Sequence, residues 1–90
     1  MIVAFSPRSA RDLEALADYI ARDNPQRALS FIAELRDACM GLAEFPDRFP
    51  LSRVGREGTR QRIFGQYAII YRVEGQTVRI LQVIHAARLA

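Results

Sequence analysis

The sequence predicts an α+β fold with the element order β-α-α-β-β-β, in which a helical hairpin packs on a small antiparallel sheet. Three observations predict it. A short run rich in β-branched and aromatic residues opens the chain. Two apolar stripes of helical period follow, separated by an Asn-Pro break. The last third of the chain then holds two strand-like runs on either side of a glycine turn.

The first strand is expected over residues 1–5, and the first helix directly after it. Ser6 is a favourable N-cap, and Pro7 suits the first helical position because no N–H is required there. Apolar residues then recur at steps of three and four, which predicts one buried helix face. The residues of this face are Ala10, Leu13, Leu16, Ala17 and Ile20.

The second helix is expected to begin at Asn24-Pro25 and to end at Phe45-Pro46. Because proline disfavours helical geometry in the preceding residue, the first helix should stop near Asp23, and Asn24 can cap the next one. The apolar stripe of this second helix comprises Ala28, Phe31, Ile32, Leu35, Ala38, Cys39 and Leu42. Two matching stripes with almost no linker can be buried only if the helices fold back as a hairpin.

Residues 46–59 contain two prolines and two glycines and are expected to form a loop. A loop of this length in a small domain is often functional. A strand should follow from Arg60 to Phe64, with Arg60 and Arg62 on one face and Ile63 turned inward.

The final hairpin is expected to pair residues 67–73 with residues 78–84. A two-residue turn at Gly75-Gln76 would place Val73 opposite Val78. The face expected to cover the helices comprises Tyr67, Ile69, Tyr71, Val73, Val78, Ile80 and Ile84. The opposite face comprises Ala68, Ile70, Arg72, Arg79, Leu81, Val83 and His85. Because this second face mixes apolar and charged residues, we expect part of it to be covered.

Length and composition exclude several classes of protein. Ninety residues make one domain, residues 1–90. No apolar run approaches the ~20 residues needed to span a bilayer, and the N-terminus lacks the basic start of a signal peptide, so we expect a cytoplasmic protein with no membrane partner. The single cysteine, Cys39, fits a small core residue. One cysteine and one histidine do not suit a zinc site, so no metal or cofactor is expected.

Charge is distributed unevenly along the chain. Residues 1–47 carry five arginines against eight acids, a net charge of −3, and residues 48–90 carry eight arginines against two acids, a net charge of +6. This asymmetry indicates an acidic or phosphate-bearing partner for the C-terminal half. The chain has arginine and no lysine, which suits recognition of carboxylates and phosphates. A GC-rich coding sequence would produce the same preference.

Two positions in the hairpin have alternative interpretations. The expected register sets Arg72 opposite Arg79, and facing like charges destabilise a sheet. Either Glu74, diagonal to Arg79, screens the two arginines, or an acidic partner does. His85 ends the last strand and is either a structural hydrogen-bonding residue or an acid–base group, although no carboxylate near it in sequence would orient it.

The succession of motifs from about residue 3 to residue 88 resembles ParE-type toxins of the RelE/ParE toxin–antitoxin superfamily. The motifs that carry the resemblance are Ser6-Pro7, Ala10-Arg11-Asp12-Leu13, Ala17-Asp18-Tyr19-Ile20, Asn24-Pro25, Leu42-Ala43-Glu44-Phe45-Pro46, Tyr67-Ala68-Ile69-Ile70-Tyr71-Arg72-Val73 and Val83-Ile84-His85-Ala86-Ala87-Arg88. The resemblance implies the same fold and the toxin role in a type II toxin–antitoxin system. It also implies a ParD-like antitoxin whose acidic, partly disordered C-terminal segment wraps the toxin, with operator DNA contacted only through that antitoxin.

The resemblance allows two activities. RelE-type toxins cleave mRNA on the ribosome, and ParE-type toxins inhibit DNA gyrase. RelE-type enzymes carry arginine directly after the tyrosine matched by Tyr67, where this chain has Ala68, and again just after the last strand, where it has Ala86. The two alanines favour a gyrase inhibitor that is not an enzyme.

Two alternatives remain. One is a ribosome-dependent mRNA endonuclease, and the other is an inert relative that acts as a corepressor with its antitoxin. An endonuclease would use Arg60, Arg62, Arg72 and His85 or Arg88. For the gyrase inhibitor as for the alternatives, the residues expected to bind the antitoxin or target are Arg60, Arg62, Arg72, Arg79, Leu81, Val83, His85 and Arg88.

Overall fold

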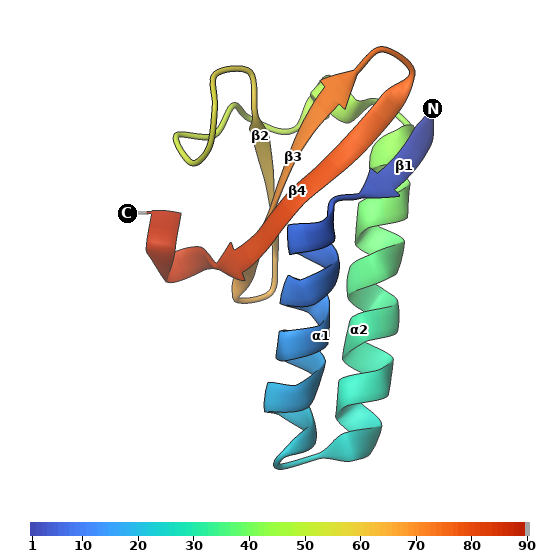
Figure 1. Ribbon diagram of the computed structural model, residues 1–90, viewed down its shortest axis with the longest axis vertical. Coiled ribbons are helices and arrows are strands. Elements are labelled where there is room, and N and C mark those ends of the chain that lie inside the picture. Colours follow the sequence, from blue (N-terminus) through green and yellow to red (C-terminus); the bar gives the residue numbers. More distant parts are fainter. Residues whose placement is uncertain (90) are drawn as a thin grey trace.

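The computed structural model describes residues 1–89, and it confirms the predicted order of elements. Two helices form one layer and a four-stranded sheet forms the other (Figure 1). The elements are β1 (Ile2–Phe5), α1 (Pro7–Ala21), α2 (Pro25–Met40), β2 (Arg60–Phe64), β3 (Tyr67–Glu74) and β4 (Thr77–His85). Short 3₁₀ turns lie at Gly41–Ala43, Pro46–Arg48 and Ala86–Leu89. Within the described residues, neither helix combines the length and apolarity that crossing a bilayer requires.

The sheet is mixed, with the order β1-β4-β3-β2. β2, β3 and β4 form the expected antiparallel meander, but β1 pairs with β4 in parallel, with Val3 opposite Val78. The prediction of an antiparallel sheet is therefore wrong for this one strand. A parallel neighbour requires a long crossover connection, and the segment between β1 and β4, which includes both helices, supplies one.

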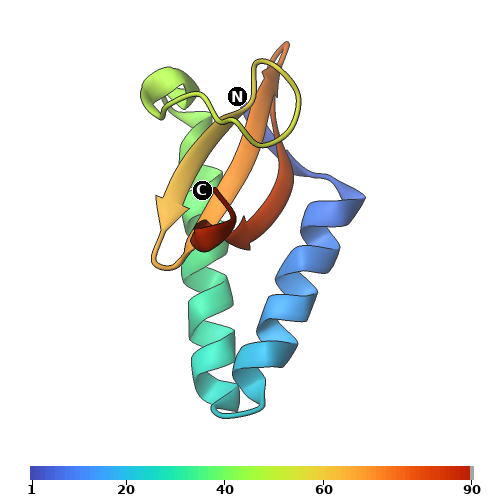
Figure 2. The ribbon, with the colours of Figure 1, turned by 90° about the vertical axis from the view of Figure 1, so that its left-hand side faces the viewer.

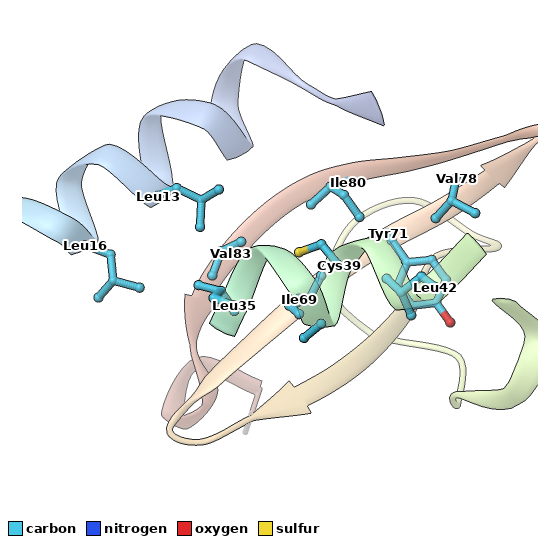
Figure 3. Packing of buried hydrophobic residues seen from close by; sticks show 11 residues of the cluster. Leu13, Leu16, Leu35, Cys39, Leu42, Ile69, Tyr71, Val78, Ile80 and Val83 are labelled. Carbon is cyan, nitrogen blue, oxygen red and sulfur yellow. The ribbon is translucent and has the colours of Figure 1, made fainter. Parts of the chain in front are cut away.

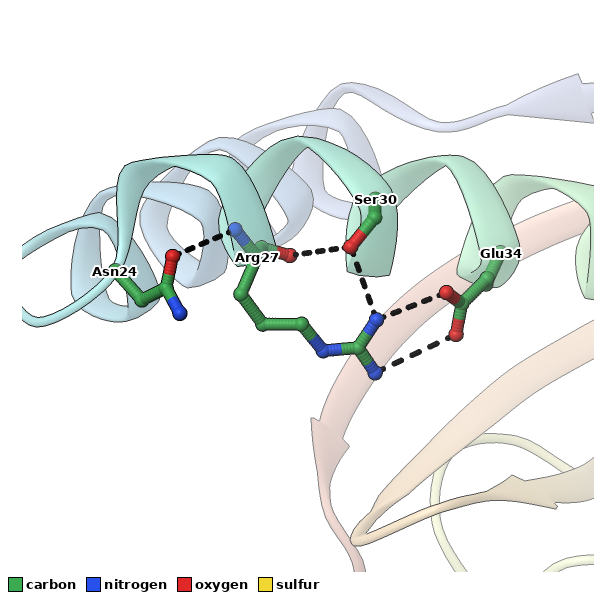
Figure 4. Close-up of polar contacts among 4 residues, drawn as sticks. All are labelled: Asn24, Arg27, Ser30 and Glu34. Carbon is green, nitrogen blue, oxygen red and sulfur yellow. Dashed lines mark hydrogen bonds and ion pairs between the residues drawn. The ribbon is translucent and has the colours of Figure 1, made fainter.

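Both helices begin where their capping residues predict. Ser6 Oγ accepts a hydrogen bond from Ser9 N at 3.0 Å, and Asn24 Oδ1 accepts one from Arg27 N at 3.0 Å (Figure 4). The helices fold back as a hairpin whose connecting end projects beyond the sheet (Figures 1 and 2). On the exposed side of α2, Arg27 Nη1 contacts Glu34 Oε2 at 2.8 Å, an exposed ion pair of the kind that contributes little to stability.

The main core lies between the helical hairpin and the sheet (Figure 3). Its fully buried members include Leu35 and Cys39 from α2 and Tyr71 from β3. Burial raises the pKa of the Cys39 thiol to about 12, which agrees with its predicted role as an apolar core residue.

The buried face of α1 differs from the predicted face at one position. Ala10 is exposed, and Ser9, four residues before Leu13, is buried in its place. The structure permits this burial because Ser9 Oγ donates to the Ser6 carbonyl at 3.0 Å, so the hydroxyl keeps a hydrogen-bond partner.

A β-bulge in β4 changes which side chains face the helices. Tyr71 pairs with Ile80 as predicted, but Ile70 pairs with Gln82, so Leu81 is an extra residue without a cross-strand partner. The predictions that Val83 and His85 share the face of Arg72, and that Ile84 faces the helices, are therefore wrong.

The start of α1 holds this bulge in place. Ser6 donates to the Ile80 carbonyl through its backbone N–H and to the Leu81 carbonyl through Oγ at 2.8 Å. Asp12 Oδ2 accepts from Val83 N at 2.9 Å. Beyond the end of β1, Ser6 and Asp12 thus supply hydrogen-bond partners for backbone groups of β4 that β1 does not reach. Val83, with 8% of its surface exposed, packs in the core.

The outer face of the sheet is partly covered by the chain itself. Ala68, Ile70 and Ile84 form a second buried cluster, against which Val54 and Leu89 pack. Val54 belongs to the loop before β2, where Thr59 Oγ1 donates to the Val54 carbonyl at 2.8 Å. The expected cover over the mixed face is thus confirmed, and it comes from this loop and the turn at Ala86–Leu89.

Candidate arginine-rich binding surface

The arginines of β2 lie on the helix-facing side of the sheet. Arg62 pairs with Ile69 and Arg60 pairs with Tyr71, both of which face the core. Ile63 lies opposite Ala68 on the outer face and is 51% exposed, so the prediction that it turns inward is wrong. The pairing register with β3 therefore determines which face each β2 side chain is on, and it puts Arg60 and Arg62 on the side of the helices.

Both β2 arginines donate to main-chain carbonyls. Arg62 Nη1 donates to the Ala38 carbonyl in the last turn of α2 at 2.8 Å, and its guanidinium lies 5.0 Å from the centre of the Phe49 ring. Arg60 Nη1 donates to the carbonyls of Phe49 at 2.7 Å and Asp47 at 3.3 Å. A guanidinium near the C-terminus of a helix also complements the helix dipole. These two arginines therefore fix the end of α2 and the segment that follows it.

The Tyr71 hydroxyl holds the same segment from the sheet. It donates to the Pro46 carbonyl, and burial raises the pKa of Tyr71, so the hydroxyl remains a donor at neutral pH. The preceding residue, Phe45, has a left-handed backbone with φ 54°. Sequence reasoning missed this anchor, although a tyrosine expected in the core should find a partner for its hydroxyl.

The outer face carries a second arginine pair, joined by one carboxylate. Arg72 donates to Glu74 Oε2 through Nε at 3.1 Å and also through Nη2, and Arg79 Nε donates to Glu74 Oε1 at 2.9 Å. These hydrogen bonds lower the pKa of Glu74. We call these three residues the Arg72–Glu74–Arg79 cluster. The interpretation in which Glu74 screens the facing arginines is confirmed, and a net charge of +1 remains on the cluster.

His85 ends β4 beside a row of aromatic rings. Its ring meets Tyr67 edge-on at 5.5 Å, and Tyr67 lies 5.7 Å from Phe31 of α2. His85 Nδ1 accepts a hydrogen bond from Ala87 N at 3.2 Å, which orients the exposed ring. This contact agrees with a structural role for His85 in the turn that follows β4.

The predicted site residues fall into separate places. Arg60 and Arg62 face the helices, whereas Arg72 and Arg79 lie on the outer face. Among the other predicted site residues, Leu81 is half-buried at the bulge, Val83 is in the core, and His85 and Arg88 are exposed at the C-terminal end of the sheet. Within residues 1–89, no three His, Cys, Asp or Glu side chains gather closely enough to hold a metal ion.

Residues 3–90 match the family model described as the ParE toxin of the type II toxin–antitoxin system, parDE. The chain belongs to the ParE toxin family. It is a type II toxin of the RelE/ParE superfamily, as its motifs indicate. It is 34% identical over 88 residues to toxin RelE2 of Caulobacter vibrioides, covering 97% of each chain. It is 33% identical over 87 residues to the putative toxin Y4kP of Sinorhizobium fredii, covering 93% of this toxin and 86% of that protein.

Solved structures of ParE and RelE systems share the fold of this toxin. The chromosomal ParDE system of P. aeruginosa superposes with a TM-score of 0.81 at 20% identity, covering 94% of this toxin and 95% of that chain. The RelBE2 complex of Mycobacterium tuberculosis superposes with a TM-score of 0.67 at 29% identity, covering 93% and 95%. The structure is therefore RelE/ParE-like.

Proposed function

We propose that this toxin inhibits DNA gyrase and is neutralised by a ParD-like antitoxin. One observation carries the proposal. Ala68, at the position where RelE-type enzymes have arginine, is fully buried in the cluster that Val54 and Leu89 cover. Reacting RNA phosphate requires charge stabilisation at an accessible position. A buried alanine supplies neither the charge nor the access.

The arrangement of the remaining arginines also supports a binding protein. Arg62 is bonded to a helix carbonyl and Arg72 to Glu74, on opposite faces of the sheet. His85 lies at the far end of β4 from the Arg72–Glu74–Arg79 cluster. Groups that act on one phosphate must converge on it, and these groups are spread over two faces and both ends of the sheet. They suit recognition of a large partner surface.

A gyrase assay tests the proposal directly. Purified toxin is incubated with DNA gyrase, ATP and relaxed plasmid, and the products are separated by gel electrophoresis. We expect supercoiling to stop or cleaved plasmid to accumulate at micromolar toxin, and premixing the toxin with its antitoxin should abolish the effect. Normal supercoiling at that concentration would count against gyrase as the target.

A second candidate, ribosome-dependent cleavage of mRNA, is favoured by one specific finding. The relative at 34% identity bears the name toxin RelE2. His85 is the informative residue to change, because it is exposed, whereas loss of Arg62 would disturb the end of α2. Codon-phased cuts in translated mRNA that disappear in His85→Ala would support this activity. If neither cleavage nor gyrase inhibition occurs and expression leaves growth unimpaired, a corepressor role is favoured.

A further inference from the structure

We infer that the Arg72–Glu74–Arg79 cluster receives an acidic side chain of the antitoxin, which takes the place of Glu74 between the two arginines. This inference rests on the antitoxin part of the proposed function and makes no use of the gyrase part. In the free toxin, Glu74 would then act as an internal substitute for the partner's carboxylate.

The Arg72–Glu74–Arg79 cluster is accessible from solvent. The side chains of Arg72, Glu74 and Arg79 are 29%, 35% and 40% exposed, so a carboxylate from outside can reach both guanidinium groups without opening the core. Glu74 engages Arg79 through Nε, and a guanidinium carries five N–H donors, so an incoming carboxylate can bind a free donor of Arg79 before it displaces Glu74.

The two arginines are held more firmly in the cluster than the Glu74 side chain is. Strand pairing places Arg72 opposite Arg79, and the two-residue turn at Gly75-Gln76 fixes this register. The backbone positions of the arginines are therefore set, whereas Glu74 holds them only through its side chain. Ion pairs this exposed contribute little to stability. The cost of releasing Glu74 is small, and the arginines would stay in place for the incoming group.

Arg60 and Arg62 differ from Arg72 and Arg79 in the groups that they bind. Apart from the exposed Asp47 carboxylate, 3.7 Å from Arg60 Nε, the partners of the β2 arginines are main-chain carbonyls in the last turn of α2 and in the segment that follows it. Replacing those carbonyls would release that segment. An acidic antitoxin segment can therefore exchange with a toxin carboxylate on the outer face, but not with the carbonyls on the helix-facing side. Glu74 is ionised at neutral pH, as its lowered pKa also requires, so it competes with an incoming carboxylate under physiological conditions.

Competition predicts that removing the Glu74 charge strengthens binding. The probe is the full-length antitoxin encoded beside the toxin gene, and association and dissociation rates are measured with the intact toxin at low and at physiological salt. We expect Glu74→Gln to bind roughly three- to tenfold more tightly than the unmodified toxin, with faster association at low salt. Arg72→Gln and Arg79→Gln should each weaken binding by a similar factor.

A matched control separates competition from general charge steering. Glu57 is an exposed acid in the loop before β2, so Glu57→Gln makes the same change in net charge away from the cluster. It should alter affinity by less than about twofold. An antitoxin without its acidic tail should bind the unmodified toxin and Glu74→Gln equally well.

Equal effects of Glu74→Gln and Glu57→Gln would overturn the inference, and so would weaker binding of Glu74→Gln. If Glu74→Gln does not fold, Glu74→Asp keeps the charge but shortens the reach to the arginines. It should also bind more tightly, and unchanged or weaker binding would refute competition. If the unmodified toxin does not bind the antitoxin, the antitoxin part of the proposed function fails together with this inference. A negative gyrase assay would leave the inference standing.

Discussion

Arg60 and Arg62 of β2 donate to main-chain carbonyls in the last turn of α2 and in the segment after it, whereas Arg72 and Arg79 of the last hairpin share the carboxylate of Glu74. The two pairs have the same side-chain chemistry, and in the sequence both are candidates for partner binding. A carbonyl of the packed chain has a fixed position, but an exposed carboxylate can be exchanged for another one. The first pair should therefore contribute mainly to stability and the second mainly to recognition.

The largest expected effect on stability comes from Arg62→Ala. The change leaves the Ala38 carbonyl at the end of α2 without its donor and removes the contact with Phe49. A hydrogen bond from a charged donor contributes about 2 kcal/mol, so the free energy of unfolding in urea should fall by about that amount. The control is Arg88→Ala, because Arg88 is an exposed arginine of the C-terminal turn. This variant should change the free energy of unfolding by less than about 0.5 kcal/mol. If both variants lower the free energy of unfolding equally, the β2 arginines have no special role in stability.

A smaller loss is expected for Tyr71→Phe. The ring stays in the core, but the Pro46 carbonyl loses the hydroxyl that binds it. A neutral hydrogen bond contributes about 1 kcal/mol, and thermal unfolding followed by circular dichroism measures the change. Tyr19→Phe, on the exposed side of α1, should be neutral. No destabilisation in Tyr71→Phe would mean that the arginines alone hold the segment after α2.

The smallest expected effect on stability is the loss, at acidic pH, of the contribution from the Arg72–Glu74–Arg79 cluster. Because its arginine partners lower the pKa of Glu74 in the folded toxin, the cluster contributes stability above the ordinary carboxyl pKa. That contribution is lost as the pH falls through the lowered value. The difference in unfolding free energy between the unmodified toxin and Glu74→Gln should therefore shrink from neutral to acidic pH. A difference that stays constant over this range would show that the carboxylate has no stabilising role.

Local signals in the sequence were sufficient for the elements and for much of the sheet register. Ser6-Pro7 and Asn24-Pro25 mark the two helix starts, and Gly75 marks the turn that sets Arg72 opposite Arg79. Each of these depends on a few neighbouring residues, so the sequence pattern reveals them. The screening role of Glu74 is equally local, because all three members of the cluster lie within one hairpin.

Long-range contacts determined what the sequence pattern could not. Leu81, Val83 and Ile84 are all apolar, so alternation cannot locate an extra residue among them. The bulge depends on Ser6 and Asp12, which lie 75 and 71 residues away from their partners in β4. Similarly, the rule that apolar residues turn inward placed Ile63 in the core, whereas pairing with β3 puts Arg60 and Arg62 on that side, where they donate to carbonyls in the last turn of α2 and after it.

The position of β4 has a consequence for the nascent toxin. This strand follows every other strand in the sequence, yet it lies inside the sheet, between β1 and β3. During synthesis, β1 and both helices emerge before the strand on which they pack. Until residues 77–85 are made, β1 lacks its neighbour, α1 lacks the strand that Ser6 and Asp12 bind, and Arg72 lacks Arg79. Completion of the sheet, and with it of the outer arginine pair, is therefore delayed until translation has passed the last strand.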